Sequence, residues 1–435
     1  MYAYSKKGSL HGTCAVPGSK SATIRATLFG AIADGVTVIH NPLPSKDGLA
    51  ALAVARHFGA TVVEDEEANT WTVTGLNGKP KVPDTVIDTM NSGTTTSFAT
   101  GLCALLTDGY AVITGDEQIR RRPWLDELKA LRELGAECFT TRPDCECPPM
   151  VVKGPIHGGT CHVPGHNSQH ISGLLATCAL LPAGESVDII VDNPKEALYV
   201  MLTVQWLERF GVKVEASPDF KRYHVEGGQK LKACECLVAS DWSGVAFPLV
   251  AAVLTDSELT ITDVDFNDAQ GDKAVADVLI KMGADIEKDI EGHKLVVRGG
   301  KKLHGLDEVD MDLIPDSLPV LTVAACFAEG DTKFTNLAHV RIKETDRVAV
   351  MQEVLTMCGA DIDITADTLT VHGGKPMHCA SVPSYDDHRV CMAMCVCGLA
   401  CEEGEMQVSN PECAAVSFPS FYELMNKLGA GIEVR

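Results

Sequence analysis

The chain has 435 residues, more than one hydrophobic core usually holds, so two or three domains are expected. Its formal net charge of −22 and its lack of a basic block argue against nucleic acid as a partner. No apolar run is long enough to span a membrane and the N-terminus has no apolar signal segment, so we expect neither a membrane span nor secretion. The 17 cysteines, many inside apolar runs, predict reduced thiols and a cytoplasmic protein.

Two kinds of helix are expected in alternation along the chain. The first kind is short and apolar, and a strand-like run follows each copy, as VTVIHN follows ATLFGAIADG (26–35). In five of the six copies a glycine should end the helix in a left-handed conformation. These glycines are Gly35, Gly109, Gly184, Gly330 and Gly404.

The second kind of helix is amphipathic and leads into Gly-Ala or Gly-Val and a further strand pattern. Its glycines lie 70 to 76 residues apart, at Gly59, Gly135, Gly211, Gly283, Gly359 and Gly429. Each repeat therefore reads as strand, apolar helix, strand, amphipathic helix, strand and strand. Because the apolar helices must be surrounded on most sides, we expect three repeats per domain, with helices inside and strands outside, and two domains with a cleft between them.

A polar segment precedes each apolar helix. The six segments are PGSKSATIR (17–25), MNSGTTTS (90–97), PGHNSQH (164–170), SDWSG (240–244), LIPDS (313–317) and SYDDHRV (384–390). Ordinary N-capping explains their Ser, Thr, Asn and Asp residues and is the simpler interpretation of any single segment. Capping does not explain Lys20, Arg25, His388 or Arg389, because a cation at a helix N-terminus opposes the helix dipole. Bound anions would remove that conflict.

The segment HVRIKETDR (339–347) places charges of both signs directly before an apolar pattern with helical spacing. A solvated surface turn is one interpretation, and an anion site beside an acid or base is the other. No dinucleotide-binding or phosphate-loop motif is present. The Cys-Glu-Cys pairs at Cys145/Cys147 and Cys234/Cys236 lack zinc-like spacing and partner histidines, so we expect no metal and no cofactor.

Four segments together resemble the signature segments of the 5-enolpyruvylshikimate-3-phosphate synthase (3-phosphoshikimate 1-carboxyvinyltransferase) family. They are PGSKSATIRA (17–26), IPDSLPVL (314–321), RIKETDRV (341–348) and YDDHRV (385–390). The resemblance implies an α/β fold with two domains of three βαβαββ units each, helices inward, sheets outward and the active site in the interdomain cleft. It implies a first domain of residues 18–238 and a second domain of residues 1–17 plus 239–435, which close over substrate.

The resemblance also implies a reaction. The enolpyruvyl group of phosphoenolpyruvate moves to a hydroxyl of shikimate 3-phosphate through a tetrahedral intermediate, and phosphate is released. This reaction belongs to the shikimate pathway, toward chorismate and the aromatic amino acids. It needs cations for two anionic substrates and groups that both give and take protons. The resemblance implies small-molecule substrates, no cofactor and a monomeric protein.

Roles are implied for the residues that match the family's motifs. Lys20, Asp316 and Glu344 are expected to be catalytic, with Lys20 as a proton carrier, Asp316 as a base and Glu344 acting on C3 of phosphoenolpyruvate. Phosphoenolpyruvate binding is expected of Lys20, Arg347, Arg389, His388 and Arg120. Acceptor binding is expected of Ser21, Arg25, Asn167, Ser168, Gln169, Tyr199, Asp316 and Lys343. A satisfied structural histidine is the alternative interpretation of His388.

The chain departs from the family pattern at positions expected to contact phosphate. Gln118 and Ser97 stand where the family has arginines, and Val416 stands where it has a lysine. Asn167 replaces a phosphate-binding serine, and Glu196 lies near the place of another. The side that binds the carboxylate of phosphoenolpyruvate therefore matches the pattern, while both phosphate-binding sides do not. The neighbouring arginines 120–122 would compensate if their loop were shifted.

Three alternatives stay open. A family member could act on a different cyclic hydroxy acid, including one without a phosphate. A non-catalytic binding protein on the same fold is disfavoured by the joint presence of Lys20, Asp316, Glu344 and the two motif arginines. The related UDP-N-acetylglucosamine enolpyruvyl transferases use a loop cysteine in the region of GDEQIRRRPW (115–124), where this chain has none.

Overall fold

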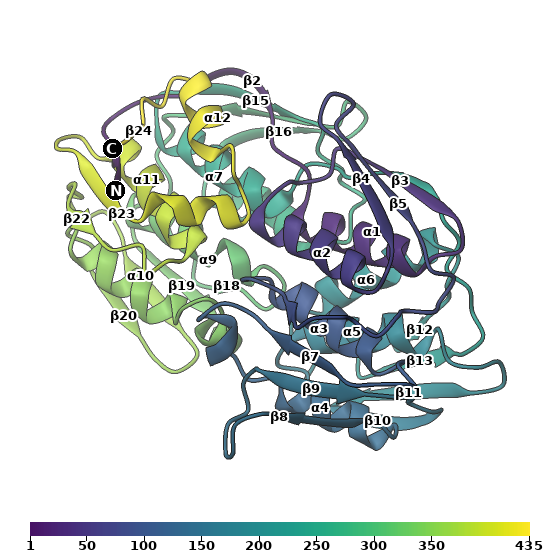
Figure 1. The fold of residues 1–435 in the computed structure, drawn as a ribbon. Helices are drawn as coiled ribbons and strands as arrows, with labels where there is room; N and C mark the ends of the chain where they lie inside the picture. Colours follow the sequence, from purple (N-terminus) through teal and green to yellow (C-terminus); the bar gives the residue numbers. More distant parts are fainter. The chain divides into compact units, whose positions relative to one another are not determined.

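The computed structural model describes residues 1–435 and divides the chain into two compact units (Figure 1). Unit 1 consists of Met1–Ser19 and Ala239–Arg435, and unit 2 consists of Lys20–Val238. The first boundary falls after Ser19, where helix α1 begins.

Unit 2 contains three four-stranded sheets and six α-helices. The sheet orders are β14-β3-β5-β4, β6-β7-β9-β8 and β10-β11-β13-β12. The strands are β3 (Val36–His40), β4 (Thr61–Asp65), β5 (Thr70–Thr74), β6 (Ile87–Asp88), β7 (Ala111–Thr114), β8 (Glu137–Thr140), β9 (Met150–Lys153), β10 (Gly159–Val163), β11 (Ser186–Val191), β12 (Glu215–Ala216), β13 (Arg222–Glu226) and β14 (Glu235–Leu237). The helices are α1 (Lys20–Ile32), α2 (Lys46–His57), α3 (Gly93–Cys103), α4 (Leu125–Glu133), α5 (Ser168–Cys178) and α6 (Ala197–Arg209), with a 3₁₀ turn η1 (Ile119–Arg121).

Unit 1 repeats the same plan, with sheet orders β16-β17-β15-β2, β18-β19-β21-β20 and β22-β23-β1-β24. Its strands are β1 (Tyr2–Ser5), β2 (His11–Ala15), β15 (Glu258–Thr262), β16 (Asp285–Asp289), β17 (Lys294–Arg298), β18 (Val309–Asp310), β19 (Asp331–Thr335), β20 (Ile362–Ile364), β21 (Leu369–His372), β22 (Ser381–Val382), β23 (Met406–Ser409) and β24 (Glu433–Val434). Its helices are α7 (Trp242–Leu254), α8 (Ala274–Lys281), α9 (Leu318–Cys326), α10 (Arg347–Thr356), α11 (His388–Ala400) and α12 (Phe421–Lys427). Short 3₁₀ turns are η2 (Gly271–Lys273), η3 (Pro315–Ser317), η4 (Ala338–Ile342) and η5 (Pro411–Val416).

Two strands explain where the chain passes from one unit to the other. Strand β2 precedes α1 in sequence, yet it pairs in parallel with β15 of unit 1, with Cys14 opposite Ile261. Strand β14 precedes α7 in sequence, yet it pairs in parallel with β3 of unit 2, with Cys236 opposite Ile39. Each of these two sheets thus takes one edge strand from a distant segment, and every one of the six sheets has four strands.

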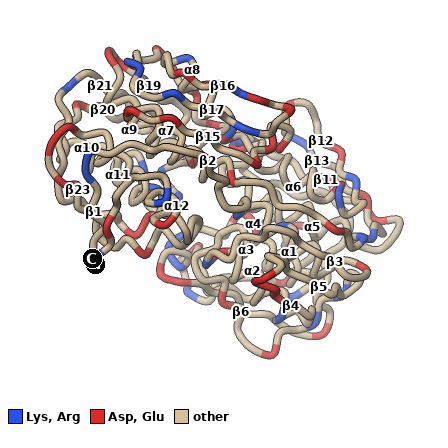
Figure 2. The backbone as a smooth tube through the Cα atoms, turned by 90° about the horizontal axis from the view of Figure 1, so that it is seen from above, with Lys and Arg blue, Asp and Glu red and all other residues tan.

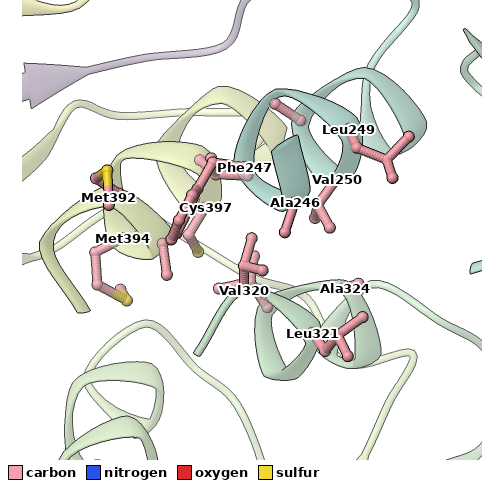
Figure 3. Packing of buried hydrophobic residues seen from close by; sticks show 14 of the residues in the cluster. Ala246, Phe247, Leu249, Val250, Val320, Leu321, Ala324, Met392, Met394 and Cys397 are labelled. Atoms are coloured by element: carbon pink, nitrogen blue, oxygen red, sulfur yellow. The ribbon is translucent and has the colours of Figure 1, made fainter. Parts of the chain in front are cut away.

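The apolar helices form the interior of each unit. In unit 1, α7, α9 and α11 face one another through fully or almost fully buried side chains such as Phe247, Val320 and Cys397 (Figure 3). In unit 2, every residue of α1 after Lys20 is buried. Burying one Leu- or Phe-sized side chain contributes roughly 1.5–3 kcal/mol, so these helices supply much of the driving force for folding. The arrangement confirms the predicted fold class, with helices inside and sheets outside.

The glycines that end the amphipathic helices have the predicted backbone conformation. All six have positive φ, from 81° at Gly211 to 108° at Gly429, a region that other residues rarely adopt. Four of the five glycines predicted to end the apolar helices also have positive φ. The prediction is wrong for Gly109, whose φ is not in this region; α3 itself ends at Cys103, with Ala104 as its C-cap.

Basic residues are fewer than acidic residues and do not form a large cluster of their own. Acidic and basic positions are interspersed over both units and no long basic run appears along the chain (Figure 2). None of the helices combines the length and the hydropathy that crossing a membrane requires. All 17 cysteines are free thiols, and most are buried.

Candidate active site

Unit 1 brings two arginines and one carboxylate together at the starts of three elements. Asp316 lies in η3, Arg347 is the first residue of α10 and Arg389 is the second residue of α11. The Asp316 carboxylate accepts a 2.9 Å hydrogen bond from Arg347 Nη1 on one oxygen and a 2.9 Å hydrogen bond from Arg389 Nη2 on the other. The structure therefore places these three predicted site residues in one cluster.

Arg347 is completely buried and contacts two further carboxylates. Its Nε and Nη2 donate to the two oxygens of Asp387 at 2.8 and 3.2 Å, and Nη2 also donates to Glu344 Oε2 at 2.7 Å. Asp387 is buried as well, and it caps α11 by accepting from the backbone N–H of Arg389 at 2.9 Å. A buried guanidinium requires such partners, because an unpaired charge in the interior is very costly.

The electrostatics of this cluster hold Asp316 and Asp387 ionised. Burial alone would raise the pKa of Asp316, but Arg389, Arg347 and Lys343 more than offset this and keep that pKa well below its ordinary range. The same balance between burial and Arg347 lowers the pKa of Asp387. Burial would lower the pKa of the Arg347 guanidinium, but its three carboxylate partners raise that pKa above the usual range.

Two other predicted residues border the cluster. His388 is buried at the first position of α11, between Asp387 and Arg389 in sequence. Lys343 follows η4 and lies close enough to Asp316 to lower the pKa of that carboxyl group. Arg341 and Asp346 have a structural role, because Arg341 Nη1 donates to both oxygens of Asp346, at 3.0 and 2.7 Å, and Asp346 caps α10.

Unit 2 places Lys20 and Arg25 on α1, in different environments. Lys20 Nζ lies 3.2 Å from Asp47 Oδ2, and its side chain is 14% exposed. Arg25 is buried and donates from Nε to Thr203 Oγ1 at 2.9 Å and from Nη2 to the backbone oxygen of Tyr199 at 3.1 Å. Arg25 therefore joins α1 to α6, a structural contact that the sequence did not indicate.

The N-terminus of α5 carries three of the predicted acceptor-binding residues. Asn167 is the N-cap, and its side-chain oxygen accepts from the backbone N–H of Gln169 at 3.0 Å. Ser168 donates from Oγ to Glu196 Oε2 at 2.8 Å, and its backbone N–H donates to the same oxygen at 3.4 Å. Glu196 is buried and precedes α6, whose first turn contains Tyr199.

The loop between β7 and α4 places its arginines in different environments. Arg120 is exposed, and its guanidinium donates to the backbone oxygen of Gly115 in its own loop. Gly93, the first residue of α3, has no side chain, and two other side chains fill the space beside it. The position that a Cβ would take on Gly93 lies 3.1 Å from Arg122 Nη1 and 2.6 Å from Gln169 Oε1. Arg122, rather than Arg120, therefore lies with Gln169 against the start of α3. Gln118 accepts from Asn91 at 2.9 Å in the same loop.

The substituted positions Ser97 and Val416 are buried and bring no charge. Ser97 Oγ and the side-chain polar atoms of Trp124 and Glu127 are all buried without a well-formed hydrogen bond. Burial raises the pKa of Glu127 well above its ordinary range, and the nearby Ser97 and Trp124 only partly oppose this shift. No group of three or more His, Cys, Asp or Glu side chains has an arrangement that would hold a metal ion.

The repeated four-stranded sheets around apolar helices, together with the motif residues at the helix starts, define an enolpyruvyl transferase. The profile of EPSP synthase (3-phosphoshikimate 1-carboxyvinyltransferase) matches residues 4–425. The chain therefore belongs to the EPSP synthase family.

Relatives and solved structures agree with this assignment over the whole chain. A 3-phosphoshikimate 1-carboxyvinyltransferase of Ruminiclostridium cellulolyticum is 40% identical over 435 residues, which is 100% of both chains. Another of Methanocaldococcus jannaschii is 38% identical, covering 99% of this chain and 98% of the other. An EPSP synthase structure from Acinetobacter baumannii has a TM-score of 0.83 at 29% identity and covers 100% of both chains. An enolpyruvyl transferase from Streptomyces tendae shares the fold, with a TM-score of 0.78 at 18% identity.

Proposed function

We propose that the chain transfers the enolpyruvyl group of phosphoenolpyruvate to a hydroxyl of shikimate 3-phosphate and releases phosphate. The observation that carries this proposal is the pair of arginines, Arg347 and Arg389, that converges on the Asp316 carboxylate. Two planar guanidinium groups suit a carboxylate such as that of phosphoenolpyruvate better than a lysine would. Full-length relatives named for this reaction support the same conclusion.

The addition step joins the two substrates. The acceptor hydroxyl oxygen forms a bond to C2 of phosphoenolpyruvate, the hydroxyl proton leaves, and C3 gains a proton to become a methyl group. Asp316 would accept the hydroxyl proton and Glu344 would deliver the proton to C3. In the elimination step the C2–O bond to phosphate breaks, phosphate leaves and C3 loses a proton again. The same groups then work in reverse, so neither a cofactor nor a net oxidation is needed.

Asp316 becomes an effective base only after the substrate has bound. While Arg347 and Arg389 both donate to it, the lowered pKa of its carboxyl group makes it a weak proton acceptor. A substrate carboxylate that takes over the two guanidinium groups would release Asp316 and raise its pKa toward the ordinary range. Substrate binding would thereby activate the base only when phosphoenolpyruvate is in place.

The unit 2 residues would hold the phosphate of phosphoenolpyruvate and the acceptor. Lys20 and Arg122 are the cations that we assign to the phosphate of phosphoenolpyruvate, with Arg122 in place of the predicted Arg120 because Arg122 lies beside Gln169. We assign Ser21, Ser168, Gln169 and Tyr199 to acceptor binding, and Lys343 is assigned to it from its match to the family motif. We further propose that the protein acts as a monomer in the cytoplasm, in line with its free, mostly buried thiols.

A phosphate-release assay tests the proposal. Purified protein, phosphoenolpyruvate and shikimate 3-phosphate should release inorganic phosphate in equal amount to an enolpyruvyl ether identified by mass spectrometry. Omission of either substrate should stop the release. A protein that releases no phosphate at millimolar substrate concentrations would contradict the proposal, and a panel of hydroxylated ring acids without phosphate would then test the alternative acceptor class.

A further inference from the structure

The N-terminus of α5 holds a carboxylate of the same chain. Backbone N–H groups at a helix start and a hydroxyl beside them are donors that suit a phosphate. Here the N–H and Oγ of Ser168 both donate to Glu196 Oε2, at 3.4 and 2.8 Å. The next N–H, of Gln169, donates to the side chain of Asn167 at 3.0 Å. These donors are therefore engaged by side chains before any substrate arrives.

The contact is not explained by capping of Glu196's own helix. Glu196 is the residue before α6, but its side chain makes no capping hydrogen bond there. Its side chain instead reaches the first residue of α5, 28 positions earlier in the sequence. The backbone of Glu196 is left-handed, with φ of 53° and ψ of 34°, and the residue is 1% exposed. A buried carboxylate is thus held at the first turn of another helix.

We infer that Glu196 is a specificity-determining residue which occupies the position of the acceptor's phosphate and weakens binding of a phosphorylated acceptor. This inference rests on the proposed function, which assigns Ser168 to the acceptor. A carboxylate and a phosphate ester accept from the same donors and repel each other at close range. A phosphorylated acceptor must therefore displace Glu196, whereas an acceptor with a hydroxyl in that position binds without this competition.

The experiment compares two acceptors and removes the charge at one position. Dissociation constants of shikimate 3-phosphate and of unphosphorylated shikimate are measured by titration calorimetry for the unaltered protein, Glu196→Gln and Glu196→Ser. The substitution Glu208→Gln, at an exposed position of α6, is the matched control. Steady-state turnover with shikimate 3-phosphate is measured separately, because it decides the proposed function independently of the affinities.

The inference predicts that Glu196→Gln and Glu196→Ser bind shikimate 3-phosphate about 10–100-fold more tightly, with shikimate affinity changed by less than about threefold. For the unaltered protein, the dissociation constant of shikimate should exceed that of shikimate 3-phosphate by less than about tenfold. This comparison can be made without any variant. Unchanged or weaker binding of shikimate 3-phosphate by both folded variants would overturn the inference, and so would a preference above about a thousandfold in the unaltered protein.

Discussion

Asp316 Oδ2 accepts a 2.9 Å hydrogen bond from Arg389 Nη2, so a catalytic candidate and a substrate-binding candidate neutralise each other in the structure. The other oxygen of Asp316 accepts from Arg347, which makes the carboxylate a bridge between two guanidinium groups. A substrate carboxylate must replace this bridge.

Arg389→Lys should weaken binding of phosphoenolpyruvate without unfolding the protein. Lysine keeps the positive charge but loses the planar pair of donors that a carboxylate engages. We expect the KM for phosphoenolpyruvate to rise about 10–100-fold, which corresponds to about 1.4–2.8 kcal/mol of binding free energy. Arg298→Lys, an exposed arginine of β17, should leave KM unchanged. Equal KM values for both variants would contradict the assignment of Arg389.

Glu344→Gln should reduce turnover much more than substrate affinity. The glutamine keeps the side-chain shape and can still accept from Arg347 Nη2, but it cannot give or take the C3 proton. We expect kcat to fall about 10²–10⁴-fold, the usual contribution of a general acid or base. Glu353→Gln, whose carboxylate accepts from Tyr385 in unit 1, is the control. Unchanged kcat in Glu344→Gln would refute the role of Glu344.

Asp387→Asn should be strongly destabilising. Arg347 is completely buried, and removal of the charge of its buried bidentate partner leaves the guanidinium only partly neutralised. Breaking such a buried pair costs roughly 3–5 kcal/mol, measured as the free energy of unfolding in urea. Glu329→Gln, which removes an exposed ion pair with Lys302, should leave the urea midpoint unchanged. Similar midpoints for the two variants would contradict this account of Arg347.

His170 should make the protein less stable as the pH falls. Burial against Trp124 lowers the pKa of His170 to about 4, from 6.5 for an exposed histidine. Between pH 6.5 and 4 the unfolded chain therefore binds a proton that the folded chain does not, and the free energy of unfolding decreases through this window by up to about 3 kcal/mol. His170→Phe should remove that part of the pH dependence, as measured by urea unfolding at pH 7 and pH 5. An unaltered slope would contradict it.

Local pattern was sufficient to predict much of the fold. The glycines after the amphipathic helices adopt a left-handed conformation that few other residues adopt. Their spacing in the sequence therefore identifies the repeat. The apolar helices carry too little polar surface to lie anywhere but in the interior. The pattern was insufficient at Gly109, which lacks the left-handed conformation of the other four glycines that follow apolar helices.

The site was less predictable because its decisive contacts join distant segments. The motif arginines could be recognised, yet their convergence on Asp316 depends on how η3, α10 and α11 pack. The contact between Ser168 and Glu196 spans 28 positions and has no local signal. The choice between Arg120 and Arg122 depends on the 3₁₀ turn η1, which directs the two side chains differently. The catalytic roles themselves stay predictions.

The most direct test of the proposed reaction is to run it in D₂O and follow phosphate release together with the isotope content of the product. Addition delivers a deuteron to C3 of phosphoenolpyruvate, and elimination removes one of the three hydrogens of the resulting methyl group. The account predicts phosphate release that requires both substrates, with deuterium in the vinyl CH₂ group of the enolpyruvyl ether. Release of phosphate without deuterium at this carbon, or no release at millimolar phosphoenolpyruvate and shikimate 3-phosphate, would contradict it.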